Sequence, residues 1–223
     1  MIEIRNLRFS YGKSLVLDDC SGQITAGEMV ALLGSNGSGK STLLNCLMGW
    51  VEPNSGQIII KNEALKNMST PLRSSSMAIV LSRIASLPMM TVRETLQVGI
   101  ALQKNGTSRI EHWMEVCGIN NFSDRLLNTL SDGQLQRTMI ARALIQETPI
   151  LLMDEPLAHL DHLSKIELMG LMNDLKKAGK TILFSTHDIH YINQEVDKIW
   201  FLQNKSLSTL LGSSDLNNIN WEL

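Results

Sequence analysis

The chain has 223 residues, a length that suits one compact domain with room for an inserted subdomain. Its net charge of −2, without a run of lysine or arginine, gives no indication of a nucleic-acid partner. Three cysteines without a CxxC pair favour buried, reduced thiols over disulfides or a metal site. No apolar run approaches the length of about 20 residues that a membrane-spanning helix needs. Any work at a membrane is therefore expected to depend on another subunit for the crossing.

The N-terminal part of the chain predicts strands followed by a strand–loop–helix unit. Apolar residues over 2–9 and 16–24 indicate two strands. Residues 29–33 are continuously apolar, as in a strand that is covered on both faces. A glycine-rich loop comes next, and residues 41–48 predict a helix that Gly49 ends in the left-handed conformation.

The region from about residue 83 to residue 130 has helical periodicity. Thr91 and Glu94 form a capping-box pattern, and apolar residues then recur at helical spacing. A second amphipathic stretch follows. We therefore expect a small helical subdomain, inserted in a core made of residues 1–82 and 131–223, within a single domain over residues 1–223.

Strands and helices alternate in the C-terminal part. Residues 150–153, 181–185 and 198–202 are strand-like, and residues 162–177 have a helical pattern. This alternation predicts an α/β fold with a mainly parallel sheet and helices on both of its faces. The tail beyond Lys205 is rich in Ser and Asn and is expected to be loosely structured.

The glycine-rich loop matches the pattern GxxxxGK[ST] of a phosphate-binding loop. Its glycines let backbone N–H groups point at phosphates, and the following helix adds the positive end of its dipole. A simple turn is the alternative, but a position between a buried strand and a helix is the one that phosphate binding requires. The expected nucleotide contacts are Gly34, Ser35, Asn36, Gly37, Ser38, Gly39, Lys40, Ser41 and Thr42.

Two residues of this loop, together with two carboxylates later in the chain, predict metal-assisted hydrolysis of a nucleotide. Lys40 is expected to reach the β- and γ-phosphates, and the Ser41 hydroxyl to coordinate Mg²⁺. Asp154 and Glu155 follow the apolar strand at 150–153. Acids after a strand are more often charges at a helix start, but beside a phosphate-binding loop they indicate a metal ligand, Asp154, and a general base for water, Glu155.

Residues 130–134, with the sequence LSDGQ, begin another helix. Ser131 and Gln134 form a capping-box pattern, so a well-capped helix is the simplest interpretation. A helix N-terminus with a serine and a glycine is also an anion site. At this point the sequence resembles the ABC ATPase family, whose signature LSGGQ reads LSDGQ here. The motifs follow in the order of that family over essentially the whole chain.

The resemblance implies a P-loop ABC-ATPase core with an N-terminal antiparallel β-subdomain and the inserted α-helical subdomain. It also implies ATP and Mg²⁺ as ligands. Two copies would pair head to tail, with Ser131, Gly133 and Gln134 of one copy completing the ATP site of the other.

Single residues also match positions of the family. Tyr11 matches the aromatic side chain that stacks on adenine, and Asp161 lies in the loop that communicates across the dimer. His187 matches the switch histidine that contacts the γ-phosphate. One position departs from the pattern: after the strand at 78–81 the family places a glutamine at the metal and the water, whereas this chain has Ser82. Because serine is shorter, we expect Ser82 to weaken or reroute the metal contact without abolishing hydrolysis.

The resemblance implies membrane permease subunits as partners and a location at the cytoplasmic face of the cell membrane. Residues 87–90 are an apolar patch where that family docks its permeases, with core packing as the alternative. The LSDGQ variant and the runs 90–94 and 146–161 resemble ATPases that import iron–siderophore complexes, haem or cobalamin. A solute-binding protein is then expected in the full system.

Three alternatives remain open. The first is the ATPase of a lipoprotein, peptide or lipid exporter, and the second is an ABC protein outside transport. The third is a nucleotide-binding regulator without hydrolysis, which intact Lys40, Asp154, Glu155 and His187 disfavour.

Overall fold

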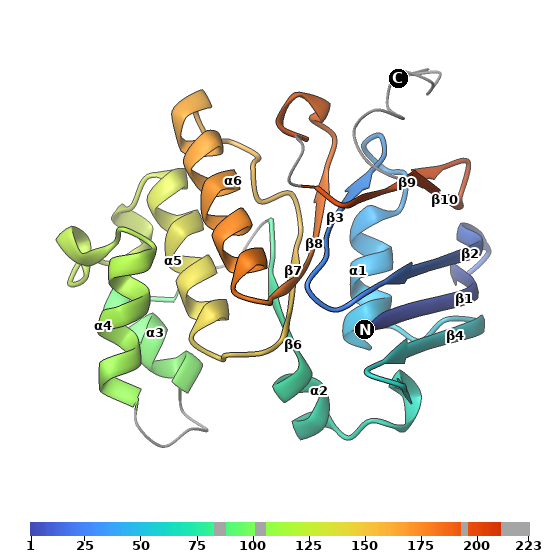
Figure 1. The fold of residues 1–223 in the computed structure, drawn as a ribbon, viewed down its shortest axis with the longest axis horizontal. Helices are drawn as coiled ribbons and strands as arrows, with labels where there is room; N and C mark the ends of the chain where they lie inside the picture. Colours follow the sequence, from blue (N-terminus) through green and yellow to red (C-terminus); the bar gives the residue numbers. More distant parts are fainter. Residues whose placement is uncertain (83–87, 101–105, 193–195, 211–223) are drawn as a thin grey trace.

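The computed structural model describes residues 1–82, 88–100, 106–192 and 196–210, which build two β-sheets with helices between and beside them (Figure 1). The smaller sheet is antiparallel, in the order β2-β1-β4-β5. Its strands are β1 (Ile2–Tyr11), β2 (Ser14–Ile24), β4 (Ser55–Ile60) and β5 (Glu63–Ala64). The N-terminal antiparallel β-subdomain that the resemblance implies is confirmed.

The larger sheet has the order β10-β9-β3-β8-β7-β6. Its strands are β3 (Met29–Leu33), β6 (Met77–Val80), β7 (Ile150–Met153), β8 (Thr181–Thr186), β9 (Lys198–Gln203) and β10 (Ser206–Leu210). Among the described strands, each neighbouring pair of this sheet is parallel except β9 and β10. The prediction of a mainly parallel sheet is confirmed.

Strand β10 corrects the expectation of a loosely structured tail beyond Lys205. Asn204 and Lys205 both have positive φ, 51° and 67°, and they join β9 to β10 as a two-residue turn. Positive φ at both central residues is the geometry that matches the twist of a hairpin. The sequence does not predict this turn, because its second residue is lysine rather than the glycine that is typical of such turns. Residues 211–223, which the same expectation covered, lie outside the described residues.

Helices lie on both faces of the parallel sheet. Helix α1 lies between the two sheets, and α5 and α6 cover the opposite face, with α3 and α4 beyond α5 (Figure 1). Helix α5 packs against both α3 and α4. The helices are α1 (Lys40–Met48), α2 (Thr70–Ser76), α3 (Val92–Ile100), α4 (Gly106–Val116), α5 (Asp132–Leu144) and α6 (His162–Lys177). In the described part of the chain, the connections contain the short 3-10 helices η1 (Leu65–Asn67), η2 (Asn120–Phe122), η3 (Leu127–Thr129) and η4 (Ile189–Tyr191).

Strand β3 shows why the fold has this layering. All five of its residues are buried. Val30 and Leu32 pack into the core formed with α1 and the antiparallel sheet, whereas Met29, Ala31 and Leu33 pack into the core formed with the outer helices. Because strand side chains alternate between faces, one apolar run serves two cores.

Two local predictions are confirmed. Gly49 ends α1 with φ 67°, and the Thr91–Glu94 capping box forms, since the Thr91 N–H donates to Glu94 over 2.7 Å and the Glu94 N–H donates to Thr91 Oγ1 over 3.2 Å. The boundaries proposed for a helical subdomain at about 83–130 remain a prediction, and 83–87 and 101–105 lie outside the described residues. No helix in the described part of the chain is both long and apolar enough to cross a membrane.

Candidate nucleotide site

The phosphate-binding loop joins β3 to α1, and two of its glycines are required by geometry. A Cβ on Gly34 would lie 2.6 Å from the carbonyl oxygen of Leu202, which is far inside normal contact distance. Gly39, immediately before α1, has φ 109°, a conformation that other residues rarely adopt. The loop can therefore approach Leu202 closely and turn into α1 only because Gly34 and Gly39 have no side chain.

Lys40 is the first residue of α1 and is buried. Its Nζ donates to the carbonyl oxygens of Gly34 and Ser35 over 2.8 and 3.2 Å and lies 3.2 Å from Oε1 of Glu155. A cavity of about 370 Å³ opens beside it. The cavity is lined by Tyr11, Val16, Asn36, Gly37, Gly39, Lys40, Ser41, Thr42 and Glu155.

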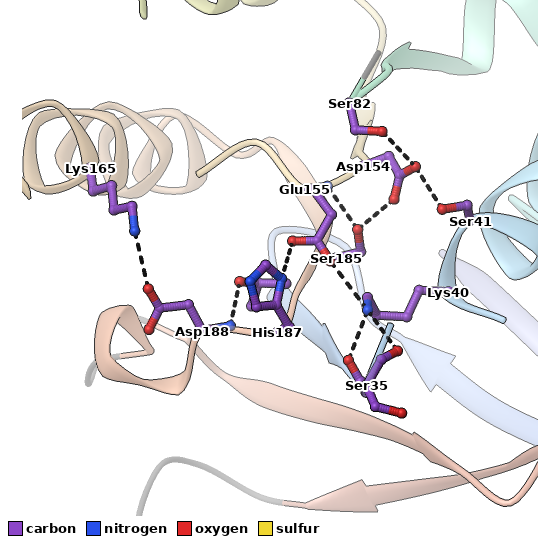
Figure 2. A network of polar contacts seen from close by, with 12 residues as sticks. Ser35, Lys40, Ser41, Ser82, Asp154, Glu155, Lys165, Ser185, His187 and Asp188 are labelled. Carbon is purple, nitrogen blue, oxygen red and sulfur yellow. Dashed lines mark hydrogen bonds and ion pairs between the residues drawn. The ribbon is translucent and has the colours of Figure 1, made fainter. Parts of the chain in front are cut away.

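Asp154 is buried and accepts hydrogen bonds from three serine hydroxyls (Figure 2). Ser41 and Ser82 donate to Oδ2 over 2.8 and 3.3 Å, and Ser185 donates to Oδ1 over 2.6 Å. A carboxylate and two hydroxyls are hard oxygen ligands, which suit Mg²⁺. The described residues hold no group of three or more His, Cys, Asp or Glu side chains gathered for a metal.

Glu155 has a strained backbone and a clamped side chain. Its φ is +46°, which is unfavourable for a residue with a Cβ. Its carboxylate lies between Lys40 and His187, whose Nδ1 is 3.0 Å from Oε2 (Figure 2). The structure thus brings Lys40, Ser41, Ser82, Asp154, Glu155 and His187 together at the carboxyl ends of the parallel strands. Ligands of open parallel sheets bind at this edge.

The signature residues lie elsewhere. Ser131 precedes α5 and forms the predicted capping box with Gln134, with distances of 3.3 and 3.2 Å for the two hydrogen bonds. Gly133 lies in the first turn of α5, near Leu160. Of the described residues that line the cavity beside Lys40, none belongs to this helix end.

Asp161 caps α6, as it accepts hydrogen bonds from the Ser164 N–H over 3.0 Å and from the Ser164 hydroxyl over 2.7 Å. The hydrogen bond from the Ser164 main chain, followed by that from its hydroxyl, lowers the pKa of the Asp161 carboxyl. Tyr11 lines the cavity, and its ring lies edge-on to Phe9 at 4.8 Å between centroids. Tyr11 as a whole residue is 52% exposed.

Sequence reasoning missed several contacts around this site. Ser185 bridges Asp154 and Glu155, and its sequence signal is a polar residue near the carboxyl end of an otherwise apolar strand. Lys165 lies 3.1 Å from Asp188 and 4.7 Å from the ring centroid of Tyr191. His162 is hydrogen-bonded to the Tyr191 hydroxyl over 2.8 Å. No sequence pattern predicts these three contacts, because α6 and η4 meet only in the folded chain.

The chain matches known families and structures over most of its length. The family model described as ABC transporter matches residues 17–158. The petrobactin import ATP-binding protein FpuD of Bacillus anthracis is 31% identical over 92% of this chain and 79% of that protein. The Fe(3+) ions import ATP-binding protein FbpC of Haemophilus influenzae is 32% identical over 91% of this chain, which spans 60% of that protein.

Two solved structures resemble the fold closely. The dimeric post-hydrolysis state of the ATP-binding cassette MJ0796, bound to ADP and phosphate, has a TM-score of 0.86 and 27% identity, and the match covers 95% of this chain and 98% of that one. The cbiO1 protein of Clostridium perfringens, part of the ABC transporter complex cbiONQ, has a TM-score of 0.86 and 28% identity over 99% of this chain and 91% of its own. With the phosphate-binding loop, the paired acids and the signature helix in the same fold, the chain belongs to the ABC transporter family as an ATP-binding ATPase domain.

Proposed function

We propose that two copies of this chain pair head to tail, hydrolyse ATP with Mg²⁺ and so drive import of an iron complex, haem or cobalamin through membrane permease subunits. The observation that carries the proposal is the convergence of Lys40, Ser41, Asp154, Glu155 and His187 at one sheet edge. If these contacts only stabilised the fold, a buried lysine beside a cavity lined by loop residues would have no explanation. Phosphate binding explains it.

In the proposed reaction, Lys40 binds the β- and γ-phosphates, and the backbone N–H groups of the loop hold their oxygens. Water attacks the γ-phosphorus while the bond to the oxygen that bridges to the β-phosphate breaks. Glu155 accepts the proton of the attacking water. His187 holds the Glu155 carboxylate in place through Nδ1 and faces the γ-phosphate, and the products are ADP and phosphate.

Asp154 and the hydroxyl of Ser41 are the residues that would hold Mg²⁺. When bound, this ion offsets the negative charge that the phosphate oxygens carry during transfer. Ser82 shares the same oxygen of Asp154 and thus acts through that carboxylate.

Pairing of two copies is supported by where the signature helix lies. Ser131, Gly133 and Gln134 lie outside the cavity beside Lys40, yet their helix N-terminus offers N–H groups that suit an anion. A second copy that approaches head to tail would bring this end to the γ-phosphate, with Asp161 near the interface. The similar cassette MJ0796 is dimeric in its ADP- and phosphate-bound structure.

A groove beside the site is suited to a permease. Two hollows, of about 570 and 220 Å³, share Met139 and Arg142 in their lining. Each hollow is lined by an exposed apolar residue, Trp50 at 53% in the larger and Val98 at 52% in the smaller. Leu87, the first residue of the predicted docking patch, lies outside the described residues. We infer that a short apolar helix of a permease binds here and holds the chain at the cytoplasmic face of the membrane.

The cargo rests on the named relatives. Those proteins are named as ATP-binding proteins for import of petrobactin and of Fe(3+) ions, and another relative, named the probable sulfate/thiosulfate import ATP-binding protein CysA of Chlorella vulgaris, is 32% identical over 97% of this chain. Import is common to them, whereas cargo contacts belong to other subunits. We therefore favour import with a solute-binding protein over export or a role outside transport.

Phosphate release and oligomeric state test the ATPase proposal together. The wild type is expected to release phosphate in the presence of ATP and Mg²⁺. Glu155→Gln is expected to lose about 10²- to 10⁴-fold in kcat, the usual contribution of a general base. The same variant should form dimers with ATP in light scattering. Full turnover of Glu155→Gln, or an ATP-bound species that stays monomeric, would contradict the assigned roles.

Cargo and direction require the assembled transporter. The complex with its co-purified permease, reconstituted in vesicles, is expected to accumulate a labelled ferric chelate, haem or cobalamin on the side of the membrane where the ATPase lies. Sulfate serves as the comparison cargo. Extrusion of peptide or lipid, without uptake of any of these compounds, would establish the exporter alternative.

A further inference from the structure

Ser185 is a buried hydroxyl that contacts both acidic residues of the site. Its Oγ lies 2.6 Å from Oδ1 of Asp154 and 2.8 Å from the main-chain nitrogen of Glu155 (Figure 2). The residue is fully buried near the carboxyl end of β8. Because β8 lies between β3 and β7, this hydroxyl lies between the phosphate-binding loop and the two acids.

The direction of both hydrogen bonds follows from the partners. A main-chain N–H can only donate, and an ionised carboxylate can only accept. The Ser185 hydroxyl therefore accepts from Glu155 and donates its one proton to Asp154. A single hydroxyl thus links the neighbouring residues Asp154 and Glu155, and the direction of both hydrogen bonds is fixed.

We propose that Ser185 is a positioning residue for ATP hydrolysis, and this inference rests on the function proposed above. By binding Oδ1 of Asp154, Ser185 leaves Oδ2 turned toward Ser41 and Ser82. Rotation of the carboxylate would break the Oδ1 contact, so the hydroxyl holds the oxygen that is presented to the metal position.

The second contact acts on the backbone of Glu155. This residue has a φ of +46°, a conformation that needs support from its surroundings. The Ser185 hydroxyl binds its N–H, and two residues later His187 binds its carboxylate over 3.0 Å. Strand β8 and its extension therefore hold Glu155 at two points, one on the main chain and one on the side chain.

A purely structural role would give Ser185 the same contacts but no effect on the metal or on the chemical step. Thr181, at the other end of β8, is a matched control. It is also fully buried, and its hydroxyl also accepts from a main-chain N–H, that of Gly27, over 3.0 Å. Each variant therefore removes one buried hydroxyl from β8. Ser185→Ala removes it within the site, whereas Thr181→Val removes it at the other end of the strand, far from the site.

The test combines kinetics with nucleotide binding that needs no turnover. Ser185→Ala is expected to lose about 10- to 100-fold in kcat, as is usual for a partner that orients a metal ligand. In the wild type, Mg²⁺ should increase the affinity for a fluorescent ATP analogue. Ser185→Ala should lose most of this increase, whereas its affinity for the analogue in EDTA should change little. Ser185→Thr, which keeps the hydroxyl, should restore most of both. Thr181→Val should lose stability in urea without either effect.

An unchanged Mg²⁺-dependent gain in affinity in Ser185→Ala would overturn the proposal, as would equal kinetic losses in Ser185→Ala and Thr181→Val. A wild type that binds nucleotide with Mg²⁺ but releases no phosphate would contradict the proposed function instead. In that case the Mg²⁺-dependent affinity still decides the role of Ser185.

Discussion

The Ser41 hydroxyl donates a hydrogen bond to Oδ2 of Asp154 over 2.8 Å, although 113 residues separate the two along the chain. Strand order explains the contact. Ser41 follows β3, Asp154 follows β7, and both strands flank β8 in one parallel sheet. Parallel strands end at the same edge, so residues that follow them meet. The contact between Ser41 and Asp154 is a consequence of this topology.

Ser82 is expected to support hydrolysis without being essential. Its hydrogen bond to Asp154 is long, at 3.3 Å, and its side chain is exposed. A hydrogen bond to a charged group contributes about 1.5–3 kcal/mol, and a long, exposed one belongs at the lower end of that range, so Ser82→Ala should lose about tenfold in kcat. Phosphate-release assays on Ser82→Ala and Glu155→Gln side by side check this. Losses of the same size would show that Ser82 is as important as the general base.

Gly133→Ala is expected to lower activity while leaving the fold intact. A Cβ at this position would have Leu160 as its nearest neighbour, at an ordinary 3.5 Å, so the single chain has room for it. In the proposed head-to-tail dimer the added methyl would instead meet the nucleotide of the partner copy, and a misplacement of about 1 Å can cost 10²-fold in rate. Activity and urea denaturation should be measured on the same sample.

Gly170→Ala is the control for that variant. Gly170 lies on the exposed side of α6, and a Cβ there would meet nothing within 4 Å. Alanine in a helix is favoured over glycine by about 0.8–1 kcal/mol, so Gly170→Ala should gain stability and keep wild-type activity. If Gly133→Ala were equally active, the signature helix would not be close to a nucleotide.

Gly49→Ala is expected to destabilise the chain. Gly49 has φ 67°, and an added Cβ would lie 2.3 Å from Nη1 of Arg73. The left-handed conformation alone costs a residue with a Cβ about 1–2 kcal/mol, and displacement of Arg73 adds to this loss. Urea denaturation of Gly49→Ala beside Gly170→Ala should give changes of opposite sign. Two changes of the same sign would contradict the role assigned to the left-handed cap.

The three cysteines are expected to be inert in the native protein. All are buried and unpaired, and burial raises the pKa of Cys20 to about 11 and that of Cys46 and Cys117 to about 12. The thiolate is the reactive form, so at pH 8 almost none is present. Ellman's reagent should react slowly with the native chain and release three equivalents in guanidinium. Fast reaction of a native thiol would place that cysteine at the surface.

The Lys165–Asp188 ion pair is expected to make stability depend on pH in acid. Burial is the largest single influence and raises the pKa of the Asp188 carboxyl, but the hydrogen bonds from Lys165 and the His190 main chain, together with the charges of these two residues, outweigh it, so the pKa is lowered from 3.8. A lowered pKa in the folded state means that the contribution is complete above pH 3.8 and is lost as the pH falls through the folded-state pKa. The contribution is expected to be about 0.5–1 kcal/mol, because both side chains are partly solvated.

Asp188→Asn should therefore be less stable than the wild type by that amount at neutral pH, and the difference should shrink in acid. A double-mutant cycle with Lys165→Met isolates the pair, and urea denaturation at several pH values measures it. If the stability difference between the wild type and Asp188→Asn grew as the pH fell, the assigned role of the ion pair would be contradicted.

The local predictions succeeded where chemistry between near neighbours decides the structure. The continuous apolar run of β3, the left-handed cap at Gly49 and the capping boxes at Thr91 and Ser131 each depend on residues within a few positions of one another. The expectation of a loosely structured tail was wrong for Ser206–Leu210, because the partner strand β9 stabilises β10 although the composition of β10 resembles a loop.

The sequence by itself determined the phosphate-binding loop, the two acids after β7, the signature helix and the family, because each is a short run of residues with its own chemistry. Only the tertiary structure decided that Ser41, Ser82 and Ser185 share one carboxylate and that Glu155 lies between Lys40 and His187. Those contacts join residues on different strands, and their distances depend on strand order and register, which no local pattern encodes.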